Sequence, residues 1–79
     1  MDNDNTMAIR FPESSMIASL EFDPKANLLY ARYQSGEAYQ YFNITWNVIK
    51  VLAEADSVGK AFHAIVKKNE HLYPFKRIA

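Results

Sequence analysis

Residues 28–42 read LLYARYQSGEAYQYF, which is two strand-like runs on either side of a Ser35-Gly36 turn. Glycine supplies the positive φ that a tight β-hairpin requires, so the pattern predicts two antiparallel strands joined at Gly36. In the first run, apolar positions alternate with polar ones, namely Leu29, Ala31 and Tyr33 against Arg32 and Gln34. We expect the apolar set to form one face of the core, because an inward Arg is costly unless it is paired.

The second run ends in the triplet Tyr39-Gln40-Tyr41. Tyr39 and Tyr41 share one face of this strand, and Ala38, Gln40 and Phe42 share the other. Both faces are partly apolar, so the pattern does not orient the strand. The two tyrosines therefore have two readings, as core residues or as a surface platform.

The hairpin extends into a small α+β fold. An alternation of apolar residues at Met16, Ala18, Leu20 and Phe22 predicts a strand before it, followed by a turn over residues 23–27. Apolar residues at helical spacing predict two helices after it, over residues 46–55 and 58–68, with Thr45 and Ser57 as N-caps. Pro74 makes the end of the chain extended. The prediction is a three-stranded antiparallel β-meander with two helices packed on one face and a C-terminal extended segment.

Length and composition limit the possibilities further. With 79 residues the chain holds one domain at most, which we place at residues 11–79 after a flexible tail at residues 1–10. The chain has no cysteine, which is typical of a reducing compartment, and no apolar run long enough to cross a membrane. We therefore expect a cytoplasmic protein that does not engage membranes.

Several segments together resemble the KTSC domain, a small domain found at the C-terminus of some lysyl-tRNA synthetases and as free-standing bacterial proteins. The resemblance spans residues 12–78 and depends on the order and spacing of short features: Ser14-Ser15, Ser35-Gly36, Tyr39-x-Tyr41, Ser57-x-Gly59, Phe62 and the run from Tyr73 to Arg77. It implies a single-domain protein of uncharacterised role. Association with the synthetase suggests RNA binding, although a fusion partner does not fix function.

The candidate site is a surface for RNA or another single-stranded nucleic acid. Tyr39 and Tyr41 are aromatic residues of the kind that stack on bases from a sheet. Lys60 and Lys67 fall on the polar face of the second helix, and Arg77 extends the positive charge. The alternative reading is structural: the tyrosines are cross-strand packing pairs, and the lysines belong to a solvated helix face.

Net charge is zero, unlike most nucleic-acid-binding modules, but the charge is unevenly distributed. Residues 1–40 carry three basic and six acidic side chains, whereas residues 41–79 carry six basic and three acidic ones. A second hypothesis is that the domain binds a protein partner or forms a homodimer. Its motivation is the apolar surplus, including Trp46 and Met16, and the unpaired edges of a short sheet.

Other kinds of site find little support. Ser57-Val58-Gly59-Lys60 lacks the first glycine and the final hydroxyl of a phosphate-binding loop. His63 and His71 are eight residues apart without cysteine, so we expect no metal site and no cofactor. Ser14 and Ser15 more simply start the first strand by bonding to the backbone, and we expect no catalytic residue.

Overall fold

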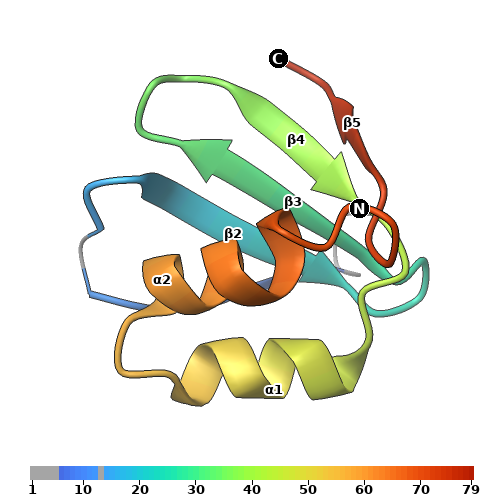
Figure 1. Ribbon diagram of the computed structural model, residues 1–79, viewed down its shortest axis with the longest axis horizontal. Helices are drawn as coiled ribbons and strands as arrows, with labels where there is room; N and C mark the ends of the chain where they lie inside the picture. The colour runs from blue at the N-terminus through green and yellow to red at the C-terminus, as the bar shows by residue number, and fades with distance from the viewer. Residues whose placement is uncertain (1–5, 13) are drawn as a thin grey trace.

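The computed structural model describes residues 6–12 and 14–79, and its central element is an antiparallel sheet of five strands (Figure 1). The spatial order follows the chain, β1-β2-β3-β4-β5. The strands are β1 (Met7–Ala8), β2 (Ile17–Asp23), β3 (Leu28–Tyr33), β4 (Ala38–Tyr41) and β5 (Phe75–Arg77). The α+β class and the predicted meander, which corresponds to β2-β3-β4, are confirmed.

The prediction of three strands is wrong, because a short strand is added at each edge of the meander. Met7 pairs with Phe22 on one side, and Arg77 pairs with Tyr39 on the other. Strands of two and three residues are too short to show an alternating pattern, and their neighbours hold them in place. The tail predicted over residues 1–10 therefore contains a paired strand at Met7–Ala8, while residues 1–5 lie outside the described part. The C-terminal segment is extended, as predicted, and β5 lies within the sheet.

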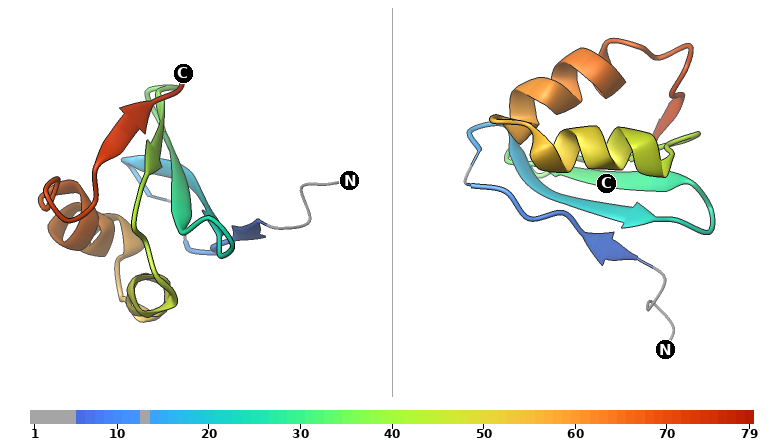
Figure 2. Two further views of the ribbon diagram at one scale, coloured as in Figure 1. Left: turned by 90° about the vertical axis from the view of Figure 1, so that its right-hand side faces the viewer. Right: turned by 90° about the horizontal axis from the view of Figure 1, so that it is seen from below.

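Two helical segments, α1 (Trp46–Glu54) and α2 (Val58–Phe62), lie on one face of the sheet, and no helix of the described residues lies on the other face (Figures 1 and 2). The second helix continues as the π-helical segment η2 (His63–Lys67), marked by the hydrogen bond from Lys68 N–H to the His63 carbonyl (3.0 Å). The predicted extents of both helices are nearly correct. The wider π turn was not predicted, and it changes the direction of the residues that follow His63.

The core lies between the helices and the sheet. Leu29, Ala31 and Tyr33 are buried there and Arg32 is exposed, as the hairpin pattern predicts. In β2 the expected alternation holds at Leu20 and Phe22, which are buried, and fails at the start of the strand, because the register shifts between Ile17 and Ser19. This irregularity buries Ile17 and leaves Ala18 exposed, whereas Ala18 was predicted to face the core.

The turns and caps follow the predicted chemistry in most places. Gly36 has a φ of 100°, and Asn27 ends the β2–β3 turn with a φ of 55°. The Ser57 hydroxyl oxygen accepts a hydrogen bond from Lys60 N–H (3.3 Å) at the start of α2. Thr45 occupies the N-cap of α1 without a side-chain cap bond.

Gly59 packs closely against the segment that leads into β2. The Ser14 hydroxyl oxygen accepts hydrogen bonds from the backbone N–H groups of Met16 and Ile17, both at 3.1 Å. A Cβ atom at position 59 would lie 2.9 Å from that oxygen and 3.9 Å from the Ser14 Cβ. Because two backbone bonds fix the Ser14 side chain, a larger residue at position 59 would displace it.

This contact makes the effect of Gly59→Ala depend on residue 14. In the wild-type background we expect a loss of about 1–3 kcal/mol, the usual range for overpacking. In a Ser14→Ala background the oxygen is absent, so the same substitution should be neutral or stabilise the helix by up to about 1 kcal/mol. Urea denaturation of the four proteins measures both values, and an equal loss in both backgrounds would contradict the contact.

Candidate nucleic-acid interface

A cluster of aromatic rings forms where β3, β4 and β5 meet the second helix. Tyr41 lies at its centre, edge-on to Phe62 with ring centroids 5.2 Å apart. Tyr39 packs edge-on against Tyr33 at 5.5 Å and against Phe75 at 5.6 Å. Such edge-to-face pairs are a preferred aromatic geometry. The sheet register places Tyr39, Tyr41 and Phe75 on the same face, since Tyr41 lies opposite Phe75.

Two buried hydroxyl groups within the cluster bond to each other. The Tyr33 and Tyr41 oxygens are 2.6 Å apart, and Tyr41 is 3% exposed. Burial raises the pKa of Tyr41 well above its ordinary value, and the hydrogen bond between Tyr41 and Tyr33 raises it further. Burial also raises the pKa of Tyr33, against a lowering by its bond to Tyr41. Both hydroxyls therefore stay protonated at neutral pH, and each is the hydrogen-bond partner of the other.

A pocket of about 450 Å³ opens above this cluster. Tyr39 is only half-buried, Phe75 is 45% exposed, and both line the pocket. Its other lining residues come from the β2 approach, the hairpin and the end of the helix: Ser15, Met16, Tyr33, Gln34, Ser35, Glu37, Tyr41, Lys67 and Glu70. The volume falls within the range of roughly 300–1,000 Å³ that is usual for small-ligand sites.

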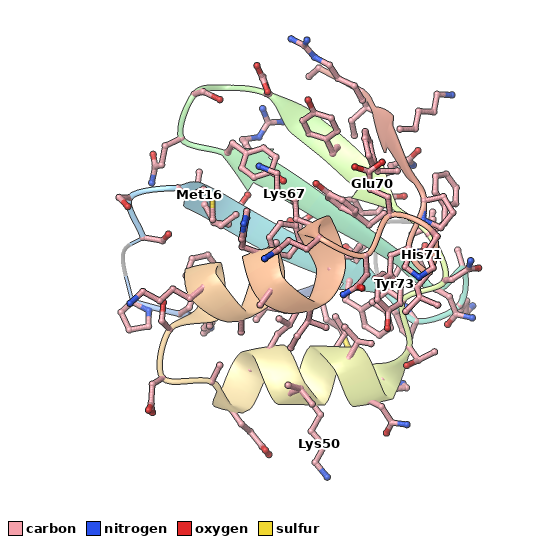
Figure 3. The ribbon with its side chains drawn as sticks, viewed as in Figure 1. Met16, Lys50, Lys67, Glu70, His71 and Tyr73 are labelled. Carbon is pink, nitrogen blue, oxygen red and sulfur yellow. The ribbon has the colours of Figure 1, made fainter. Side chains whose placement is uncertain are left out.

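The charged groups of the pocket stand around its aromatic floor. The Lys67 Nζ lies 5.1 Å from the centre of the Tyr33 ring, within the range of a cation–π interaction. In Figure 3, Lys67 extends from the end of the second helix and Glu70 from the loop that follows it. Met16 lies on the opposite side of Lys67 from Glu70 in this view. Glu37 accepts a hydrogen bond from the Tyr39 hydroxyl (3.3 Å). One cation and two acids thus surround a site with an aromatic floor.

The structure brings together some of the predicted site residues and separates others. Tyr39, Tyr41 and Lys67 line the same pocket, but Tyr41 is almost fully buried at its floor and presents little surface for stacking. Lys60 lines a neighbouring depression that shares Ser15 and Met16 with the pocket. The predicted stripe of lysines is divided because the π turn lies between Lys60 and Lys67.

Arg77 occupies the edge strand directly opposite Tyr39, on the same face of the sheet. Its Nε donates to the Ala79 carbonyl (3.0 Å), a local bond at the exposed end of the chain. Arg77 thus adjoins the pocket without lining it. The role of these five residues in binding nucleic acid stays a prediction.

Sequence reasoning missed Phe75 and the acids Glu37 and Glu70. Phe75 stands two residues before Arg77, so a strand at residues 75–77 would have placed both on one face. That strand was too short to recognise. Glu37 was considered only as a residue of the second hairpin strand. Glu70 follows the π-helical segment His63–Lys67, and the sequence did not predict that segment.

Ser14, near the pocket, has a structural role. Its hydroxyl oxygen accepts from two backbone amides, which confirms for Ser14 the predicted bonding at the start of the first strand. Within residues 6–12 and 14–79, no group of three or more His, Cys, Asp or Glu side chains is arranged to hold a metal ion. In the same part of the chain, no helix is long and apolar enough to cross a bilayer.

The fold and the pocket define a small α+β domain with an aromatic recess between a sheet and the end of a helix. Residues 13–69 match the model of the KTSC domain. The chain belongs to this family, and the resemblance of its short motifs is thereby confirmed.

The relatives of this chain are of two kinds. An uncharacterised protein of Stutzerimonas stutzeri is 34% identical over 61 residues, which cover 77% of this chain and 86% of the relative. A lysine–tRNA ligase of Nostoc is 34% identical over 56 residues, 71% of this chain but 10% of the ligase. A crystal structure of a KTSC domain protein from Yersinia pestis superposes with a TM-score of 0.77 at 23% identity, covering 94% of this chain and 99% of the other. This last likeness supports the fold.

The buried hydroxyl pair gives a prediction for stability. Tyr33→Phe or Tyr41→Phe alone leaves one buried hydroxyl without a partner, so each should cost about 1–3 kcal/mol. The double variant removes both polar groups, and its loss should be no greater than that of the worse single variant. Chemical denaturation of the four proteins gives the coupling free energy. Additive losses would show that the two hydroxyls do not depend on each other.

Proposed function

We propose that this KTSC domain binds single-stranded RNA, with one unpaired base held in the pocket over Tyr39. The observation that carries the proposal is the half-exposed Tyr39 ring in the same pocket as the Lys67 ammonium group. Proteins that bind single strands combine aromatic surfaces for bases with cations for phosphates. Here both features meet within one recess of suitable volume.

The pocket offers more than a stacking surface. Tyr39 and the exposed edge of Phe75 supply aromatic area, and Gln34, Ser15 and Glu37 supply polar atoms around it. An unpaired base exposes hydrogen-bonding edges that side chains of this kind recognise. Tyr41 supports the site from below by fixing the neighbouring rings and does not stack on the ligand itself.

The positive charges suggest a path for the strand on either side of the pocket. Lys60 lies along the same helical segment in the adjoining depression, and Arg77 lies beyond Tyr39 on β5. With Lys67, three cations are available for phosphates. Contacts to three phosphates of a single strand give a slope of about −2 in a plot of log K against log salt concentration.

The acids and the zero net charge make this binding weaker than that of a basic nucleic-acid module. Glu37 and Glu70 stand beside the pocket and repel phosphate, so the base rather than the backbone must enter there. A similar region occurs in a lysine–tRNA ligase of Nostoc, which is consistent with an RNA ligand for this domain.

Fluorescence anisotropy with short labelled oligoadenosine and oligouridine strands, at low and rising salt, tests the proposal. We expect saturable binding by the wild-type domain and a loss of affinity of about 5- to 100-fold in Tyr39→Ser, the range for one stacked base. Lys67→Gln should weaken binding and make the salt slope shallower by about 0.7.

Lys50→Gln is the matched control. It removes the same charge from α1, where the Lys50 side chain points away from the pocket (Figure 3), and should leave affinity unchanged. Circular dichroism of each variant establishes that it is folded. Absence of binding at high micromolar protein, or equal losses in Lys50→Gln and Lys67→Gln, would overturn the proposal.

A further inference from the structure

A second recess lies between β1 and α1 and has a volume of about 670 Å³. Most of its lining is apolar: Met7, Ile9, Phe22, Trp46, Ile49 and Ala53. The remaining lining residues are Ala8, Arg10, Asn47 and Lys50. None of these residues lines the pocket over Tyr39, so the two sites are separate.

Trp46 is the most exposed large apolar side chain among the described residues. It is the first residue of α1, its ring packs edge-on against Phe22 (5.3 Å), and 54% of it remains exposed. Met7 across the groove is 44% exposed. Single apolar residues on a surface are ordinary, but a tryptophan and a methionine facing one groove are typical of a contact surface.

The groove runs beside an open edge of the sheet. β1 is the first strand in the spatial order, so one side of it has no neighbouring strand within the described chain. Ile9 N–H donates inward to the Leu20 carbonyl (3.0 Å). Because backbone groups alternate in direction along an antiparallel strand, those of Ala8 are directed to the free edge. An extended segment of another chain can pair there.

The charges of the groove indicate which kind of segment fits. Its lining contains two cations, Arg10 and Lys50, and no acid among the described residues. A second copy of this chain is a poor occupant, because a two-fold contact through this patch would bring its cations against themselves. An acidic segment complements them.

We propose that this groove, formed by β1 and α1, binds an extended acidic segment of a partner protein. The segment pairs with the free edge of β1 and turns its apolar side chains toward Trp46, while its carboxylates lie near Arg10 and Lys50. This proposal does not depend on RNA binding.

Trp46 is the single tryptophan of the chain, so its fluorescence reports directly on the groove. The probe is a soluble capped peptide of alternating Glu and Val, and the matched probe alternates Lys and Val. We expect the acidic peptide to shift Trp46 emission to shorter wavelength and to saturate, and the basic peptide to have no effect. Lys50→Glu should lower the affinity for the acidic peptide severalfold and allow the basic peptide to bind.

Two control variants separate this groove from the rest of the surface. Val51→Ser changes an exposed apolar residue of α1 that does not line the groove, and Lys67→Gln changes the other pocket. Both should bind the acidic peptide as the wild type does. Equal responses to the two peptides, no response to either, or unchanged binding in Lys50→Glu would overturn the proposal.

Discussion

The hydrogen bond between the Tyr33 and Tyr41 hydroxyls constrains the whole site. Both side chains are buried, and β3 and β4 bring the two oxygens to 2.6 Å beneath the helix that carries Phe62. Because the Tyr33 and Tyr41 rings are buried in the core, Tyr39 is the tyrosine of this cluster that is only half-buried. The burial of Tyr33 and Tyr41 therefore leaves Tyr39 as the tyrosine that a ligand could contact.

The meander was predictable because its strands are long enough to alternate and its turns have diagnostic residues. Gly36 and Asn27 have the positive φ that their residue types favour, and Leu29, Ala31 and Tyr33 form the core face. The edge strands were not predictable, since two or three residues carry no period and depend on pairing with residues distant in sequence. The β2 irregularity was not predicted, because the alternation of Met16, Ala18, Leu20 and Phe22 gives no sign of the register shift between Ile17 and Ser19.

The candidate site was predictable in part. The sequence placed Tyr39 and Tyr41 on one face correctly but could not rank their exposure, because the difference arises from the position of Phe62. Lys67 was expected on one stripe with Lys60, and the π turn of His63–Lys67 instead places it over Tyr33. Trp46 was suspected as a contact residue from its apolar character alone. Its exposure at a groove beside a free strand edge came from the three-dimensional arrangement.

The central claim is that the pocket over Tyr39 is the site that binds RNA. An NMR titration of the isotope-labelled domain with a short single-stranded RNA tests it residue by residue. The account predicts saturable shifts of the backbone amides of Tyr39, Lys67 and Phe75, with little change at Ala8 or Trp46 in the second groove. Shifts confined to the open face of the sheet, at Tyr30 and Arg32, or the absence of any shift at high RNA concentration would contradict it.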